Sequence, residues 1–72
     1  MIEKAYYNRA CYRSLQWAAT TEQKEKDRIA AGIEEDLREA IGLSQENKQI
    51  ANGDSDFEAV KNEPWFQRLV TN

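Results

Sequence analysis

The sequence predicts an all-α fold: a long antiparallel helical hairpin followed by short C-terminal helices. Residues 2–19 contain neither glycine nor proline, so no residue type in this stretch interrupts a helix. Apolar residues recur at helical spacing between residues 29 and 43. The polar stretch TTEQKEK, residues 20–26, separates the two regions, and two long helices joined by a short turn run antiparallel. A chain of 72 residues forms one small domain, residues 1–72.

The first predicted helix, residues 2–19, has apolar and aromatic side chains on a broad face. Two adjacent stripes recur at helical spacing: Tyr6, Ala10, Arg13 and Trp17, and beside them Tyr7, Cys11, Ser14 and Ala18. A face this broad predicts contacts on two sides of the helix.

The second predicted helix spans residues 21–43 and begins at a predicted capping box of Thr20 and Gln23. Its apolar stripe consists of Ile29, Ile33, Leu37, Ala40, Ile41 and Leu43. The pairs Glu22–Lys26 and Glu34–Arg38 stand four residues apart in the favourable order for exposed ion pairs. We interpret the acidic run 34–36, which includes Asp36, as solvated helix surface.

The remaining third of the sequence predicts three short helices. The stretch SQENKQIA favours a helix that ends at Gly53. Ser55 with Glu58 is a capping box for a helix near 55–61. We expect a last helix near 63–70, with Asn62 as its N-cap, Pro64 in its first turn, and one apolar face of Phe66, Leu69 and Val70.

Composition excludes several classes of function. The net charge of −3 leaves no basic field for nucleic acid. No apolar run reaches the roughly 18 residues that span a bilayer, and the N-terminus lacks the apolar stretch of a signal peptide. One cysteine, Cys11, forms no internal disulfide, which fits a reducing compartment. We therefore expect a cytoplasmic location, with neither nucleic acid nor membrane as a partner.

The sequence offers little catalytic or metal-binding chemistry. It contains no histidine, and Cys11 lies within a helix, where we expect a buried, inert thiol. Four residues match places 1, 3, 5 and 12 of a calcium-binding loop: Asn52, Asp54, Asp56 and Glu63. Place 6 of that loop needs glycine, however, and here it holds Phe57. We expect no catalysis, no metal and no cofactor.

Three stretches, AYYNRACYRSL, DLREAI and DSDFEAVKNEPWFQRLV, carry a family resemblance. Together they resemble the terminal, or capping, unit of bacterial tetratricopeptide-repeat proteins, and the repeat's aromatic and small positions fall on Tyr6 and Ala10. The family's partner-binding lysine and asparagine match Tyr7 and Cys11 here, so the carboxylate-binding variety is not indicated. The resemblance implies an interaction scaffold, either the end piece of a longer array or a free-standing module.

Two functional hypotheses follow. The first is a non-catalytic protein-interaction module, which binds a protein partner or a second copy of itself as a homodimer. The second is a small-molecule sensor or regulatory domain, with a pocket between the hairpin and the C-terminal helices and Arg9 or Arg13 as the anchor. The seven aromatic residues have two interpretations: they form a partner-binding surface, or they fill the core of this small domain. The predicted partner-binding residues are Arg9, Arg13, Trp17 and Trp65.

Overall fold

The computed structural model describes residues 2–71, and every regular element among them is helical. In chain order the elements are α1 (Ile2–Ala19), α2 (Gln23–Leu43), α3 (Glu46–Gly53), the 3-10 helix η1 (Ser55–Val60) and α4 (Pro64–Val70). The prediction of an all-α fold built on a helical hairpin is confirmed, and the predicted helix near 55–61 is a tighter 3-10 helix.

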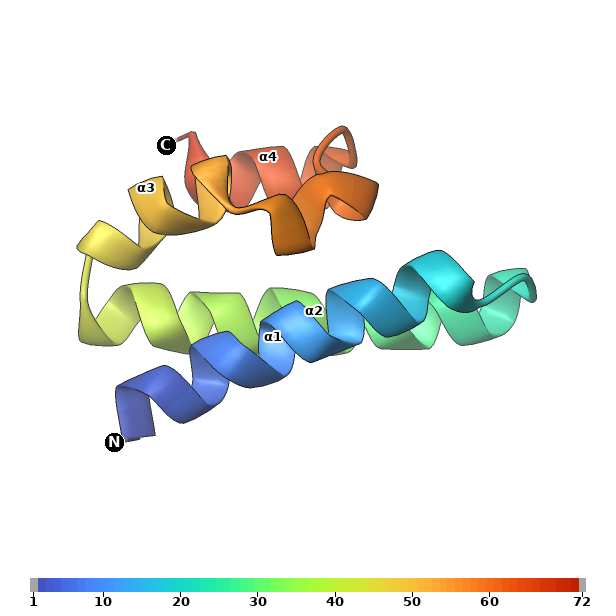
Figure 1. The fold of residues 1–72 in the computed structure, drawn as a ribbon, viewed down its shortest axis with the longest axis horizontal. Helices are drawn as coiled ribbons and strands as arrows, with labels where there is room; N and C mark the ends of the chain where they lie inside the picture. Colours follow the sequence, from blue (N-terminus) through green and yellow to red (C-terminus); the bar gives the residue numbers. More distant parts are fainter. Residues whose placement is uncertain (1, 72) are drawn as a thin grey trace.

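The five helices form two layers (Figure 1). The antiparallel hairpin of α1 and α2 makes one layer, and α3, η1 and α4 make the other. Within this arrangement η1 packs on α1, and α4 packs on α2. The short C-terminal helices therefore cover one side of the hairpin and leave the opposite side of α1 without a neighbour.

The turn between α1 and α2 does not contain the predicted capping box of Thr20 and Gln23. The Thr20 hydroxyl donates to the Gln16 carbonyl at 2.8 Å, which satisfies an acceptor in the last turn of α1. Thr20 is therefore already used by the preceding helix, and the capping box with Gln23 is wrong. The residue at the N-cap of α2 is Glu22, whose side chain makes no capping hydrogen bond.

Two further predicted caps are each wrong by one residue. At the start of η1 the cap is Asp54, whose Oδ1 accepts the Asp56 backbone N–H at 2.9 Å, so Ser55 lies inside the helix. A carboxylate is a good acceptor for backbone N–H groups at a helix start. At the start of α4 the N-cap is Glu63 rather than Asn62, and Pro64 lies in the first turn as predicted.

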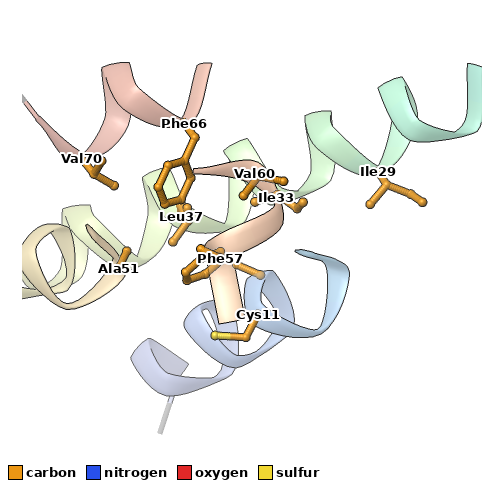
Figure 2. Packing of buried hydrophobic residues seen from close by; sticks show 10 residues of the cluster. Cys11, Ile29, Ile33, Leu37, Ala51, Phe57, Val60, Phe66 and Val70 are labelled. Carbon is orange, nitrogen blue, oxygen red and sulfur yellow. The ribbon is translucent and has the colours of Figure 1, made fainter. Parts of the chain in front are cut away.

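The core lies between the two layers (Figure 2). Phe57 of η1 and Phe66 of α4 are fully buried, and their ring centroids lie 5.4 Å apart. The Tyr7 ring meets Phe57 edge-on at 5.7 Å. The buried cluster consists of Ala10, Cys11, Ile29, Ile33, Leu37, Ala51, Phe57, Val60, Phe66 and Val70. The prediction that Phe66 and Val70 share the packed face of the last helix is confirmed.

Candidate functional site

The side of α1 that faces away from the C-terminal layer is exposed and largely apolar. Tyr12 is 68% exposed and Leu15 55% exposed, the two highest values among the large hydrophobic residues of the described chain. They belong to a row of exposed residues with alternating spacings of three and four, which we name the α1 outer face: Ala5, Asn8, Tyr12, Leu15 and Ala19. Asn8 stands at the edge of this face, since it also lines a cavity between α1 and α3.

The helical period explains why this face is uncovered. Ala10 and Ser14 are fully buried, and each stands two residues from Tyr12. Two residues correspond to about 200° around an α-helix, so the buried and exposed faces are opposite. The packing of α1 against α2 and η1 uses one face and leaves the other to solvent.

The charged residues of α1 from residue 4 onward are all positive. Residues 4–19 contain no aspartate or glutamate. Lys4 and Arg9 are exposed at the margins of the face, and the neighbouring Gln16 is neutral. At the end of the helix, Glu22 in the turn contributes an exposed carboxylate. The face therefore has a cation near its N-terminal end and an anion beyond its C-terminal end.

A second feature of α1 is an ion-pair cluster of Arg9, Arg13 and Asp36, which we name the Asp36 cluster. Asp36 is only 1% exposed. Arg9 donates to it twice, from Nε to Oδ2 at 3.0 Å and from Nη2 to Oδ1 at 2.8 Å. Arg13 donates from Nη1 to Oδ2 at 2.9 Å. Both carboxylate oxygens are thus satisfied by the hairpin's other helix, as a buried carboxylate requires.

The prediction that Asp36 belongs to a solvated surface is wrong. Asp36 stands three residues after Ile33 and four before Ala40, which places it on the buried stripe of α2. The hydrogen bonds to Asp36 raise the pKa of the Arg9 guanidinium, which keeps the positive charge in place. The cluster joins α1 to α2 by charge as well as by apolar contact. The predicted pair Glu34–Arg38 is present at 2.8 Å on the exposed side.

A third feature connects α1 to the start of η1. The Tyr7 hydroxyl donates to Asp54 Oδ2 at 2.7 Å, and the Cys11 sulfur lies 4.0 Å from the same oxygen. Burial, reinforced by the hydrogen bond and the negative charge of Asp54, raises the pKa of Tyr7. Burial, together with the charge of Asp54, raises the pKa of Cys11 to about 12. Cys11 is therefore a buried neutral thiol, as the sequence predicts.

Potential ligand atoms of Cys11, Asp54 and Asp56 lie within 4.8 Å of one another. Metal binding by cysteine requires the thiolate, which the raised pKa of Cys11 disfavours. The two oxygens of Asp54 already accept hydrogen bonds from Tyr7 and from the Asp56 backbone. These groups fit a structural contact between the two layers better than a metal centre.

A cavity of about 320 Å³ opens between the N-terminal half of α1 and α3. Its lining combines polar and apolar side chains: Lys4, Tyr7, Asn8, Ser44, Glu46, Asn47 and Ile50. The Asn47 amide donates to the Ala40 carbonyl at 2.8 Å, which fixes that side chain at the wall. Among the described residues the cation that lines the cavity is Lys4, and neither Arg9 nor Arg13 reaches it.

The four predicted partner-binding residues do not form one surface. Arg9 and Arg13 hold Asp36. Trp17 lies partly buried against the core with the Lys26 ammonium 3.9 Å from its ring centroid. Trp65 packs partly against the core and meets Phe66 edge-on at 6.1 Å. Their part in partner binding stays a prediction.

Sequence reasoning counted Tyr12 among the seven aromatic residues that supply either surface or core, but it missed Leu15 and the exposed row that the two residues share. The signal was available, because the spacing 5, 8, 12, 15, 19 is that of a third helical stripe on α1. Its exposure, however, depends on which face of α1 the hairpin buries.

No family model, curated protein or solved structure matches this chain in the comparisons. Within residues 2–71, no helix combines the length and apolar character needed to cross a membrane.

Proposed function

We propose that the chain is a non-catalytic protein-interaction module whose contact surface is the α1 outer face. The observation that carries this proposal is the exposure of Tyr12 and Leu15, at 68% and 55%, side by side on one helix. Side chains three residues apart on a helix are neighbours, so the two form a continuous apolar patch. Tyrosine is among the residues enriched in protein interfaces.

The remaining chemistry supports a binding role rather than catalysis. The chain has no histidine. Its buried carboxylate, Asp36, is held by two arginines, and its cysteine carries a raised pKa. A scaffold of this kind agrees with the resemblance to terminal tetratricopeptide-repeat units. We also propose a cytoplasmic location, in keeping with a free thiol at Cys11.

The proposal is tested by photo-crosslinking in cells that produce the chain. A photoreactive phenylalanine analogue replaces Tyr12 or, separately, Leu15. We expect discrete crosslinked species from both positions. The matched control is Leu43, which is 53% exposed at the end of α2, on a different element. Equal crosslinking from position 43, or none from positions 12 and 15, would contradict an interaction surface on α1.

A second candidate function is supported by the cavity between α1 and α3. Its volume of about 320 Å³ lies at the lower end of the range of small-molecule sites, about 300–1,000 Å³. Lys4 and Glu46 offer opposite charges, and Tyr7 and Ile50 offer an apolar wall, which suits a small ligand with both charges and an apolar part.

A thermal-shift screen of amino acids and other small zwitterions tests this candidate. A ligand at 100 times its dissociation constant adds about 2.7 kcal/mol to the free energy of unfolding. Ile50→Glu, which places a charge in the apolar wall, should abolish any such shift. A shift that survives this substitution would assign the ligand to another place.

A further inference from the structure

We propose that the cavity between α1 and α3 binds a free amino acid with a medium-sized aliphatic side chain, and that this ligand links α3 to the hairpin. This inference rests on the second candidate function, because it uses the same cavity and names its ligand. Three observations carry it: opposite charges on the two walls, an apolar wall beside them, and a volume that fits one such ligand.

The two walls of the cavity carry opposite charges. Lys4 and Asn8 stand four residues apart on α1, so both belong to one side of that helix. Across the cavity, Glu46 and Ile50 are related in the same way on α3. In the described part of the chain, neither Lys4 nor Glu46 takes part in an ion pair. Both charges are therefore available to a ligand that carries one charge of each sign.

A free amino acid matches this arrangement of groups. Its carboxylate accepts hydrogen bonds from the Lys4 ammonium and the Asn8 amide, and its ammonium group donates to the Glu46 carboxylate. Its side chain then lies against Ile50 and the Tyr7 ring. A ligand with one charge leaves the charge on the other wall without a partner.

The volume of the cavity selects the size of the side chain. About 320 Å³ equals the liquid volume of about ten water molecules, at about 30 Å³ each. The cavity therefore suits a ligand of about ten non-hydrogen atoms. Leucine and isoleucine come close to that size, whereas glycine is about half of it and tryptophan exceeds it.

The ligand connects two elements that otherwise touch little. The helix α3 packs mainly on α2 and α4, and its direct contact with α1 is slight. Figure 1 shows α3 and the N-terminal half of α1 at the same end of the molecule. A ligand held by Lys4 on one side and by Glu46 on the other adds a contact between the two layers. Separation of α3 from α1 releases the ligand, so the bound ligand opposes that separation.

The first measurement is an NMR titration of the isotope-labelled full chain with L-leucine. Both charged side chains are exposed, and salt screens their attraction for the ligand, so we expect a dissociation constant on the order of 1 mM. The largest chemical-shift changes should come from residues 4–8 and 44–50. Three analogues each lack one feature: leucinamide has no carboxylate, N-acetyl-leucine has no ammonium group, and glycine has no aliphatic side chain. Each should bind the wild-type chain at least about tenfold more weakly.

Paired changes in the protein and the ligand test the orientation. Lys4→Gln should weaken L-leucine binding at least about tenfold and leave the binding of leucinamide, which has no carboxylate, nearly unchanged. Glu46→Gln should likewise weaken L-leucine binding and leave that of N-acetyl-leucine nearly unchanged. Lys24→Gln is the matched control, since Lys24 is exposed near the start of α2 and does not line the cavity. Far-UV circular dichroism verifies that each variant folds, and the analogue series on the wild-type chain needs no variant.

Amide hydrogen exchange tests the link between α3 and α1. With L-leucine at about ten times its dissociation constant, amides in α3 should exchange about tenfold more slowly, because opening first requires release of the ligand. Amides of the hairpin turn, residues 20–22, lie at the other end of α1 and should exchange at an unchanged rate.

The outcomes separate this inference from the proposed functions. If L-leucine at about 50 mM shifts no resonance of the cavity residues, the amino acid is overturned as the ligand. The cavity then remains a candidate site only if another compound stabilises the chain and Ile50→Glu abolishes that effect. Equal binding of L-leucine and leucinamide overturns the assigned charge contacts, and unchanged exchange in α3 with the ligand bound overturns the link. The interaction module on α1 is tested separately, by crosslinks from Tyr12 and Leu15.

Discussion

Replacing Gly32 with alanine tests the Asp36 cluster through a residue that carries no charge. A Cβ at Gly32 would lie 2.8 Å from Arg13 Nη1 and 3.3 Å from its Cζ, so the guanidinium has to move. That nitrogen is the one that donates to Asp36. The guanidinium is the far end of a flexible side chain, so it can shift, and the charge-assisted hydrogen bond, worth about 1.5–3 kcal/mol, is weakened rather than removed. The alanine gains about 1 kcal/mol of helix propensity. We therefore expect Gly32→Ala to stabilise the chain less than Gly42→Ala does, with the weakened bond offsetting the gain of about 1 kcal/mol in part or in full.

Gly42 on the same helix provides the control. Nothing lies within 4 Å of a Cβ built there, so Gly42→Ala should raise the free energy of unfolding by up to about 1 kcal/mol. In an Arg13→Ala background the obstacle at Gly32 is gone, and Gly32→Ala should then stabilise by a similar amount. Urea unfolding at neutral pH measures all four variants. If Gly32→Ala stabilises the wild-type chain as much as Gly42→Ala does, the placement of Arg13 against Asp36 is wrong.

Three further predictions concern the core and its contacts. Phe66→Ala should lower the free energy of unfolding by about 3–5 kcal/mol, as a large core truncation does; a loss below about 1 kcal/mol in urea would mean that the C-terminal layer is not docked in solution. Stability should fall as pH rises from about 9 to about 12, because the unfolded chain releases the Cys11 proton that the folded chain retains. Tyr7, whose pKa is also raised, adds to this fall above about pH 10. Tyr7→Phe and Cys11→Ala should therefore each reduce the loss of free energy of unfolding measured between about pH 9 and about pH 12. Trp65→Ala should lower the free energy of unfolding by at least about 0.5–1.5 kcal/mol, the value of its edge-on contact with Phe66. The variant should bind its partner, or a second copy, as well as the wild-type chain does. If it instead binds more weakly while its free energy of unfolding is unchanged, Trp65 is part of the partner-binding surface.

The fold was largely predictable because the helical period is a local property of the sequence. The apolar residues from Ile29 to Ile41 recur every three or four positions, and Pro64 and Gly53 bound short segments. The caps were less predictable, since neighbouring polar residues compete for the same backbone donors. Asp54 and Ser55 both suit an N-cap, and only the path of the chain determines which one occupies it.

The candidate surfaces were less predictable than the fold, for a related reason. Asp36 has the spacing of a buried residue and the chemistry of an exposed one, and only the meeting of α1 with α2 brings Arg9 and Arg13 to it. Tyr12 has the spacing of one helical stripe among three on α1. Which stripe is buried is decided by the packing of α1 against α2 and η1, which the pattern of α1 alone does not contain.

The two oxygens of Asp54 couple the local start of η1 to the docking of the whole C-terminal layer. One oxygen accepts the Asp56 N–H, two residues away, and the other accepts the Tyr7 hydroxyl, 47 residues away in sequence. Contacts between residues so distant close a long loop and form late in folding, after the local hairpin. We expect residues 54–70 to detach and re-dock as one cooperative unit, with amide hydrogens in η1 and α4 exchanging together, and faster than those at the centre of α2.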